Sequence, residues 1–202
     1  MEKTLARGGD ALRFARKTIG HSALKFAEIV DPAIKFENET DALSGLLTFD
    51  AFKCYYEANV NNNRRARLEG AKDYLLLADL DNFGQFNKTK GHLYGDAVIA
   101  DIGSRIKEVK RTEDLACRRG GDEFMVLFHD ALALDPIVQN LRHLNEQIYA
   151  DYQQLTSVSM GMVEVRRGDD FSLVHKLADA ALSDVKLNGR NDIRVYERFD
   201  TA

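Results

Sequence analysis

The chain has 202 residues, of which 45% are hydrophobic and 30% charged, and its formal net charge is −4. These values predict one packed domain of ordinary size with a short extension, and they argue against general nucleic-acid binding through phosphates. No apolar run reaches the roughly 18 residues of a membrane span, and the polar first residues do not resemble a signal peptide. The two cysteines, Cys54 and Cys117, lack metal-type spacing and favour a reducing cytoplasm.

Residues 1–40 differ in character from the rest of the chain. Apolar residues recur near helical spacing from Leu12 to Val30, and Asp31-Pro32 indicates a break before a second short helix. This segment either packs on the main body or pairs with a second chain, and the pattern leaves both open. We therefore expect a helical extension over residues 1–40, available to a second copy or a regulatory protein, and a domain over residues 41–202.

The domain alternates helical and strand-like segments. Helices are expected over residues 50–68, 92–110, 137–152 and 171–187, and strands over residues 74–78, 115–117, 124–128, 157–165 and 193–196. The polar residues 82–91 contain two glycines and are assigned to a loop. This order predicts an α+β fold with helices packed on a mostly antiparallel, five-stranded sheet.

A Gly-Gly pair stands between the two strands of the expected hairpin. Gly120 and Gly121 both accept positive φ, so the pair predicts a two-residue turn. Asp122 and Glu123 follow the pair, and Asp79 closes the buried strand before it. With strand and turn side by side, Asp79 and Asp122 point at one spot and can hold magnesium, which prefers oxygen ligands and nucleotide phosphates. The nearby Asp81 is at least as well explained as a capping residue.

Several motifs in order make residues 41 to about 198 resemble a GGDEF domain, the diguanylate cyclase family. The signature is complete at Gly120-Gly121-Asp122-Glu123-Phe124. The other matching segments are Asp41 to Leu46, Asp79-Leu80-Asp81-Asn82-Phe83, Asn87, Gly91-His92, Gly95-Asp96, and the C-terminal set Lys186, Gly189, Arg190 and Asn191. The resemblance implies a palm-like nucleotidyl-cyclase fold that condenses two GTP molecules into cyclic di-GMP and two pyrophosphates.

The resemblance also implies roles for individual residues. Asp79, the Leu80 carbonyl and Asp122 would hold Mg²⁺ or Mn²⁺ on the triphosphate. Glu123 would act at the 3′-hydroxyl as a base or as a further metal ligand, and both roles stay open. The remaining nucleotide contacts would come from Asn87 and Asp96 at guanine, and from Phe83, Gly120, Gly121, Lys186 and Arg190.

Two further features follow from the resemblance. Each site of this family holds one GTP, so a homodimer with facing domains is implied. Arg111 and Asp114 have the spacing of the family's product-inhibition site, where arginine pairs with a phosphate of cyclic di-GMP.

The chain also departs from the family pattern. Gly84 stands where a phosphate-contacting lysine is usual, Lys88 replaces an aspartate, and Thr48-Phe49 replaces Asn-Arg. The first alternative to an active cyclase is therefore a weak or inactive receptor that binds GTP or cyclic di-GMP and signals through residues 1–40. The second is a different nucleotide cyclase, against which Asp96 argues because its carboxylate matches guanine.

Overall fold

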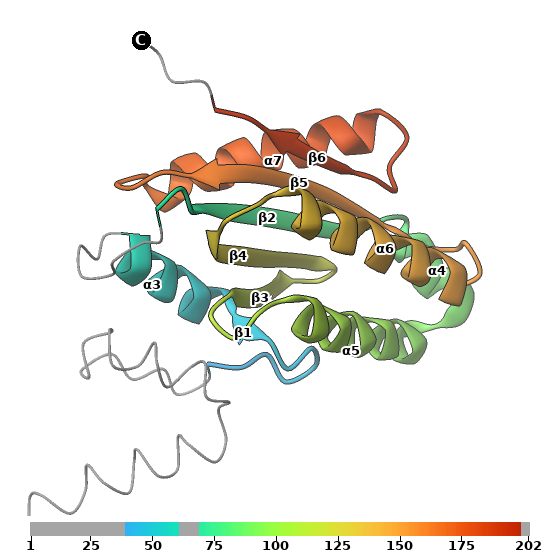
Figure 1. The fold of residues 1–202 in the computed structure, drawn as a ribbon. Coiled ribbons are helices and arrows are strands. Elements are labelled where there is room, and N and C mark those ends of the chain that lie inside the picture. The colour runs from blue at the N-terminus through green and yellow to red at the C-terminus, as the bar shows by residue number, and fades with distance from the viewer. Residues whose placement is uncertain (1–38, 61–68, 199–202) are drawn as a thin grey trace, which may run out of the picture. The chain divides into compact units, whose positions relative to one another are not determined.

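The computed structural model describes residues 39–60 and 69–198, which lie within the compact unit Asn38–Ala202 (Figure 1). The helices expected within residues 1–40, and the end of the helix expected to reach Leu68, lie outside the described residues. In the part that is described, no helix has both the length and the apolar character of a membrane span.

The described residues form one mixed sheet with five helices, which confirms the predicted α+β class. The strands follow the spatial order β1-β3-β4-β2-β5-β6. Their bounds are β1 (Leu47–Thr48), β2 (Lys72–Leu80), β3 (Leu115–Gly120), β4 (Glu123–Ala131), β5 (Val158–Val165) and β6 (Ile193–Tyr196). The helices are α3 (Phe49–Val60), α4 (Phe83–Lys90), α5 (His92–Val109), α6 (Asp135–Asp151) and α7 (Phe171–Leu187).

The sheet has six strands rather than the five expected. The additional strand, β1, is two residues long and pairs in parallel with β3. The central strands β3, β4, β2 and β5 pair antiparallel with one another in that order, and β6 pairs in parallel with β5. The expectation of a mostly antiparallel sheet is therefore confirmed, and the two parallel pairings lie at its edges.

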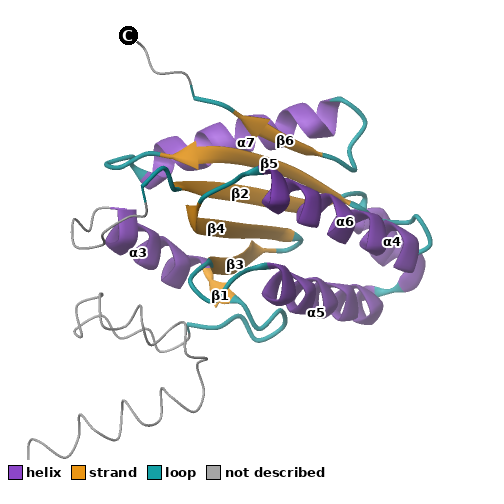
Figure 2. Cartoon of the chain, viewed as in Figure 1, coloured by secondary structure: helices purple, strands orange, loops and turns teal. Residues whose placement is uncertain are grey.

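Helices cover both faces of the sheet (Figure 2). On one face lie α5 and α6, whose buried residues pack on alternate residues of the strands, such as Leu76, Phe124 and Met160. The other face carries α3 and α7, which meet where the Tyr56 and Phe171 rings are 5.1 Å apart. This two-sided cover explains why β2 reads as a continuous apolar run instead of an alternating one.

Helix α4 occupies residues that were expected to form a loop. Phe83 and Phe86, one helical turn apart, are both buried, and their rings stack at 6.0 Å. The rest of the helix is polar, because only this narrow side faces the core. Two apolar residues in eight are too few for a periodic signal, so packing against α5 decides the structure here.

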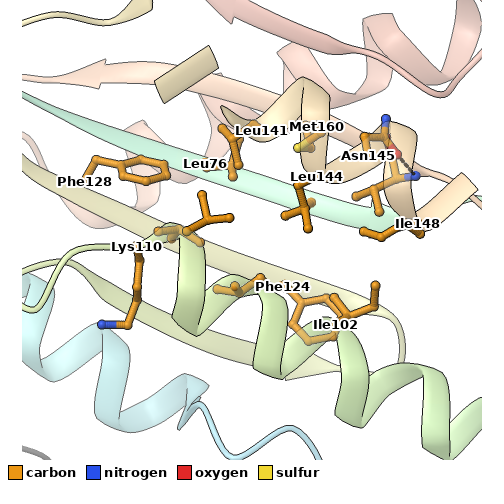
Figure 3. Close-up of a pocket in the computed structure, with 15 residues that line it drawn as sticks. Leu76, Ile102, Lys110, Phe124, Phe128, Leu141, Leu144, Asn145, Ile148 and Met160 are labelled. Atoms are coloured by element: carbon orange, nitrogen blue, oxygen red, sulfur yellow. Dashed lines mark hydrogen bonds between the residues drawn. The ribbon is translucent and has the colours of Figure 1, made fainter. Parts of the chain in front are cut away.

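A small apolar cavity lies between α5, α6 and the sheet (Figure 3). Its volume is about 30 Å³, and Leu76, Phe124, Ile102 and Leu144 are among the residues around it. Ligand pockets for small molecules usually measure about 300 Å³ or more. The cavity is therefore a packing gap in the core and not a nucleotide site.

Candidate functional site

The end of β2 and the turn of the β3–β4 hairpin lie side by side, as the sequence predicts. Asp79 in β2 is paired with Glu123 in β4. The Leu80 backbone N–H donates a hydrogen bond of 3.3 Å to the carbonyl oxygen of Asp122. The hairpin turn, α4, the start of α5 and the α7–β6 connection gather at this end of the sheet (Figure 1). Residues from three distant parts of the sequence therefore surround one region.

The turn itself is placed one residue later than predicted. Strand β3 ends at Gly120 and β4 begins at Glu123, so Gly121 and Asp122 form the two-residue turn. Both glycines have positive φ, 151° for Gly120 and 55° for Gly121, as expected. A register shift between Arg118 and Gly120 causes the offset, because Arg119 is an extra residue in β3.

Two of the expected metal-binding carboxylates pair with basic side chains. Lys186 Nζ of α7 lies 2.8 Å from Asp79 Oδ1, and Arg119 Nη1 lies 2.8 Å from Glu123 Oε2. Burial raises the pKa of Asp79 above its ordinary value, and Lys186 opposes this shift. Burial also raises the pKa of Asp122, with a further contribution from the charge of Glu123. The site thus concentrates negative charge in a partly desolvated place and balances it with two cations.

The donor atoms suit a hard cation that a nucleotide brings with it. Among the described residues, no three His, Cys, Asp or Glu side chains are gathered into a ready metal cage. Magnesium is usually bound through one or two carboxylates together with substrate phosphates, not by an all-protein cage. Asp79 and Asp122, next to the Gly120-Gly121 backbone with its open space, fit that second arrangement.

Asn87 provides a hydrogen-bonding group without a partner at the other side of the site. Its side-chain oxygen is buried, and no group in the described ranges donates to it. Buried polar atoms are rarely left unpaired in native proteins, so an unpaired one indicates a ligand or water. Gly95 of α5 makes room for this amide, since a Cβ there would lie 1.9 Å from the oxygen. Asp96 is exposed just after the first turn of α5, whereas Phe83 is buried and offers a nucleotide mainly its backbone.

The sequence model of the diguanylate cyclase GGDEF domain matches residues 38–192. The chain belongs to the GGDEF domain family. It is 30% identical over 153 residues to diguanylate cyclase DgcS of Shewanella oneidensis, and the match covers 75% of this chain and 50% of DgcS. The chain therefore spans about half the length of that relative.

Solved structures show the same fold. The GGDEF domain of DgcB from Caulobacter crescentus, in complex with cyclic di-GMP, matches with a TM-score of 0.66 and 28% identity over 80% of this chain and 98% of that one. Diguanylate cyclase SiaD of Pseudomonas aeruginosa, in complex with its activator SiaC, matches with a TM-score of 0.65 and 26% identity over 96% of this chain and 71% of SiaD. Together with the family match, these structures confirm the GGDEF fold.

Asp81 has a structural role in this GGDEF domain that the sequence did not reveal. Its side chain is buried and accepts hydrogen bonds from Ser157 Oγ at 2.6 Å, Ser159 Oγ at 2.7 Å and the Asn191 backbone N–H at 3.1 Å. The capping explanation is wrong, because Asn82 occupies the N-cap of α4 and no side chain caps it. Ser159 in the mostly apolar strand β5, and Ser157 just before it, were the available signal for a buried polar partner.

The same carboxylate fixes the segment that follows α7. Arg190 and Asn191 both have positive φ, 65° and 56°. The Asn191 N–H is bound by Asp81, and Arg190 Nε lies 3.8 Å from Asp81 Oδ1. Asp81 thus holds a backbone conformation that is unfavourable for residues other than glycine, and this places Arg190 beside the end of β2.

The expected product site of the GGDEF domain lies on another part of the surface. Asp114 is buried and accepts hydrogen bonds from the backbone N–H groups of Arg111 at 2.8 Å and His129 at 2.9 Å. The Arg111 side chain is 46% exposed and lines a cleft of about 280 Å³ together with Pro136 and Asn140. Asp114 therefore shapes the turn, and Arg111 is the side chain that faces solvent.

Proposed function

We propose that this GGDEF domain is a diguanylate cyclase of the cytoplasm, which joins two GTP molecules into cyclic di-GMP and releases two pyrophosphates. The observation that carries the proposal is the pairing of Asp79 with Glu123 at the end of the sheet, with Asp122 in the adjoining turn. The GGDEF signature thus lies beside the strand-end aspartate, in the arrangement that a metal–triphosphate complex needs.

The residues around the hairpin would bind and orient the triphosphate. Asp79, the Leu80 carbonyl and Asp122 would hold Mg²⁺ or Mn²⁺, whose charge offsets the negative charge that develops during phosphoryl transfer. The backbone of Gly120 and Gly121 lets phosphates approach closely, since no side chain intervenes there. Lys186 would exchange its contact with Asp79 for a phosphate oxygen, and Arg190 would lie nearby.

The reaction needs two copies of the domain that face each other. Each copy would hold one GTP, with guanine bound by Asn87 and Asp96, and its 3′-hydroxyl would attack the α-phosphate in the other copy. Glu123 would assist that hydroxyl as a base or bind the metal as a further ligand. Residues 1–40 would receive a regulatory protein or join the two copies, and the structure of SiaD with its activator SiaC supports regulation of a related cyclase by a partner protein.

Product inhibition is the second part of this proposal. The exposed guanidinium of Arg111 would pair with a phosphate of cyclic di-GMP, while Asp114 holds the turn in shape. The solved complex of the DgcB domain with cyclic di-GMP supports binding of this product by a related domain.

The decisive experiment incubates the purified protein with GTP and Mg²⁺ and measures cyclic di-GMP by mass-resolved chromatography. Wild-type protein should form product, and Glu123→Gln should form none. Lys72→Gln is the matched control, because it removes a charge from a surface ion pair at the opposite end of β2. If the wild-type protein forms no product but binds GTP or cyclic di-GMP tightly, the cyclase proposal is wrong. The result would then support the alternative of a receptor without catalytic activity.

A further inference from the structure

Arg119 is directed toward the site by an irregularity in its strand. The register of β3 against β4 shifts between Arg118 and Gly120, so Arg119 is a bulged residue without a pairing partner in β4. A β-bulge changes the direction of its side chain relative to the regular pleat. Its guanidinium consequently reaches Glu123, four residues along the chain and across the turn.

The contacts of Arg119 differ from those of its neighbour Arg118. Arg118 is 17% exposed and donates twice to the Gly121 carbonyl, at 2.9 and 2.7 Å, which fixes the shape of the turn. Arg119 is 39% exposed, lies 2.8 Å from the Glu123 carboxylate and sits 5.9 Å from the centre of the Phe49 ring. Both of these contacts are weak at a partly exposed site, so Arg119 can leave them at little cost.

The ion pair with Arg119 occupies a lone pair of Glu123 Oε2 and offsets the charge of the carboxylate, which lowers the affinity of Glu123 for a metal ion. In the nucleotide-free domain, Arg119 therefore competes with a divalent cation for Glu123. A bound triphosphate offers Arg119 a better partner, because a planar guanidinium with five donors matches phosphate oxygens bidentately.

We propose that Arg119 is a positioning residue that holds Glu123 in the nucleotide-free domain and transfers to a phosphate of GTP when the nucleotide binds. The Phe49 ring contacts the Arg119 guanidinium while Arg119 is paired with Glu123, and so stabilises the nucleotide-free arrangement. The nucleotide half of this inference rests on the proposed function, whereas the metal half does not depend on catalysis.

The metal half is tested by titrating the nucleotide-free protein with Mn²⁺ and measuring free Mn²⁺ by electron paramagnetic resonance. Arg119→Gln should bind Mn²⁺ about three-fold more tightly, because the competing ion pair is removed. Phe49→Leu keeps every charge and removes the ring beside Arg119, along with a ring contact to Phe171, so a gain of about two-fold is expected. Lys72→Gln, which loses one positive charge at the far end of β2, should match wild type.

The nucleotide half is tested with α,β-methylene GTP, which has no cleavable α–β bridge, in the presence of Mg²⁺. Arg119→Gln should bind this analogue about ten-fold more weakly, because a charge-assisted contact to phosphate is lost. Arg119→Lys should recover part of that loss, since it keeps the charge without the bidentate geometry. Phe49→Leu should bind the analogue as wild type does. Melting temperatures of all variants establish that each is folded.

The two titrations must move in opposite directions for Arg119→Gln. Equal affinities for wild type and Arg119→Gln, or weaker binding of both Mn²⁺ and the analogue, would overturn the inference. Tighter Mn²⁺ binding with unchanged binding of the analogue would refute the transfer to phosphate. If both shifts occur but wild-type protein forms no cyclic di-GMP, the cyclase proposal fails and the role of Arg119 stands.

Discussion

Replacing Gly95 with alanine tests whether Asn87 binds the nucleotide. A Cβ at position 95 would lie 1.9 Å from the Asn87 side-chain oxygen, and ordinary contact begins at 3.4 Å. The amide must therefore move by about 1.5 Å, which is enough to break a hydrogen bond to guanine. Loss of one such bond costs about 1 kcal/mol, or about five-fold in affinity. Alanine gains about 1 kcal/mol of helix propensity over glycine, so stability should change little.

The measurement is a calorimetric titration with α,β-methylene GTP and Mg²⁺. Gly84→Ala is the matched control, because it makes the same change in helix α4 at a place where a Cβ meets no atom within 4 Å. Asn87→Ala gives the affinity expected for complete loss of the contact. The reasoning is refuted if Gly95→Ala binds like wild type while Asn87→Ala loses affinity, and the role of Asn87 is refuted if both bind like wild type.

Three further substitutions test the stability of the domain, each measured by urea denaturation. Asp81→Ala should lower the free energy of unfolding by about 3 kcal/mol, since three hydrogen bonds to a buried carboxylate are lost. Gly161→Ala should cost about 3 kcal/mol or more, because its Cβ would lie 2.2 Å from the backbone nitrogen of Leu182, which cannot yield as a side chain does. Asp122→Asn should stabilise the metal-free protein at pH 7 by less than about 1 kcal/mol. Burial raises the pKa of Asp122 above 3.8, so its stabilising contribution is full below that pH and is lost as pH rises through the raised pKa.

Each of these expectations has a definite contrary result. An Asp81→Ala variant as stable as wild type would mean that the two serines and Asn191 find other partners. A stable Gly161→Ala variant would mean that β5 and α7 can separate. For Asp122→Asn, the stabilisation must disappear near pH 3, and a gain that is independent of pH would exclude the electrostatic cause.

The parts of the fold with strong local signals were predictable. Helix α7 and strand β6 begin and end at the predicted residues, because an apolar helical face and a short β-prone run are bounded by Asp170, which caps α7, and by Asn188-Gly189. The position of Asp79 beside the hairpin was also predictable, since a buried strand and the strands of a hairpin are normally neighbours.

The features that could not be predicted from the sequence depend on tertiary contacts. Strand β1 exists only because Leu47 and Thr48 pair with Cys117 and Arg118, and two residues carry no periodicity. Helix α4 depends on burial of two phenylalanines, and the roles of Asp81 and Arg119 depend on a buried network and on a bulge. The sequence thus predicted which residue types surround the site, but not the side-chain pairs that hold them there.

The hydrogen bond between Asp81 and Asn191 has a consequence for the order of events during protein synthesis. It joins residues that are 110 positions apart in the sequence. Asp81 and the GGDEF hairpin leave the ribosome long before Arg190 does. A nascent chain that ends after β4 therefore still lacks the segment that places Arg190. At that stage the Asp81 carboxylate also lacks its three hydrogen-bond donors, Ser157, Ser159 and Asn191. The contact that places Arg190 beside the end of β2 forms only after residue 191 has emerged, so this end of the domain is completed late in translation.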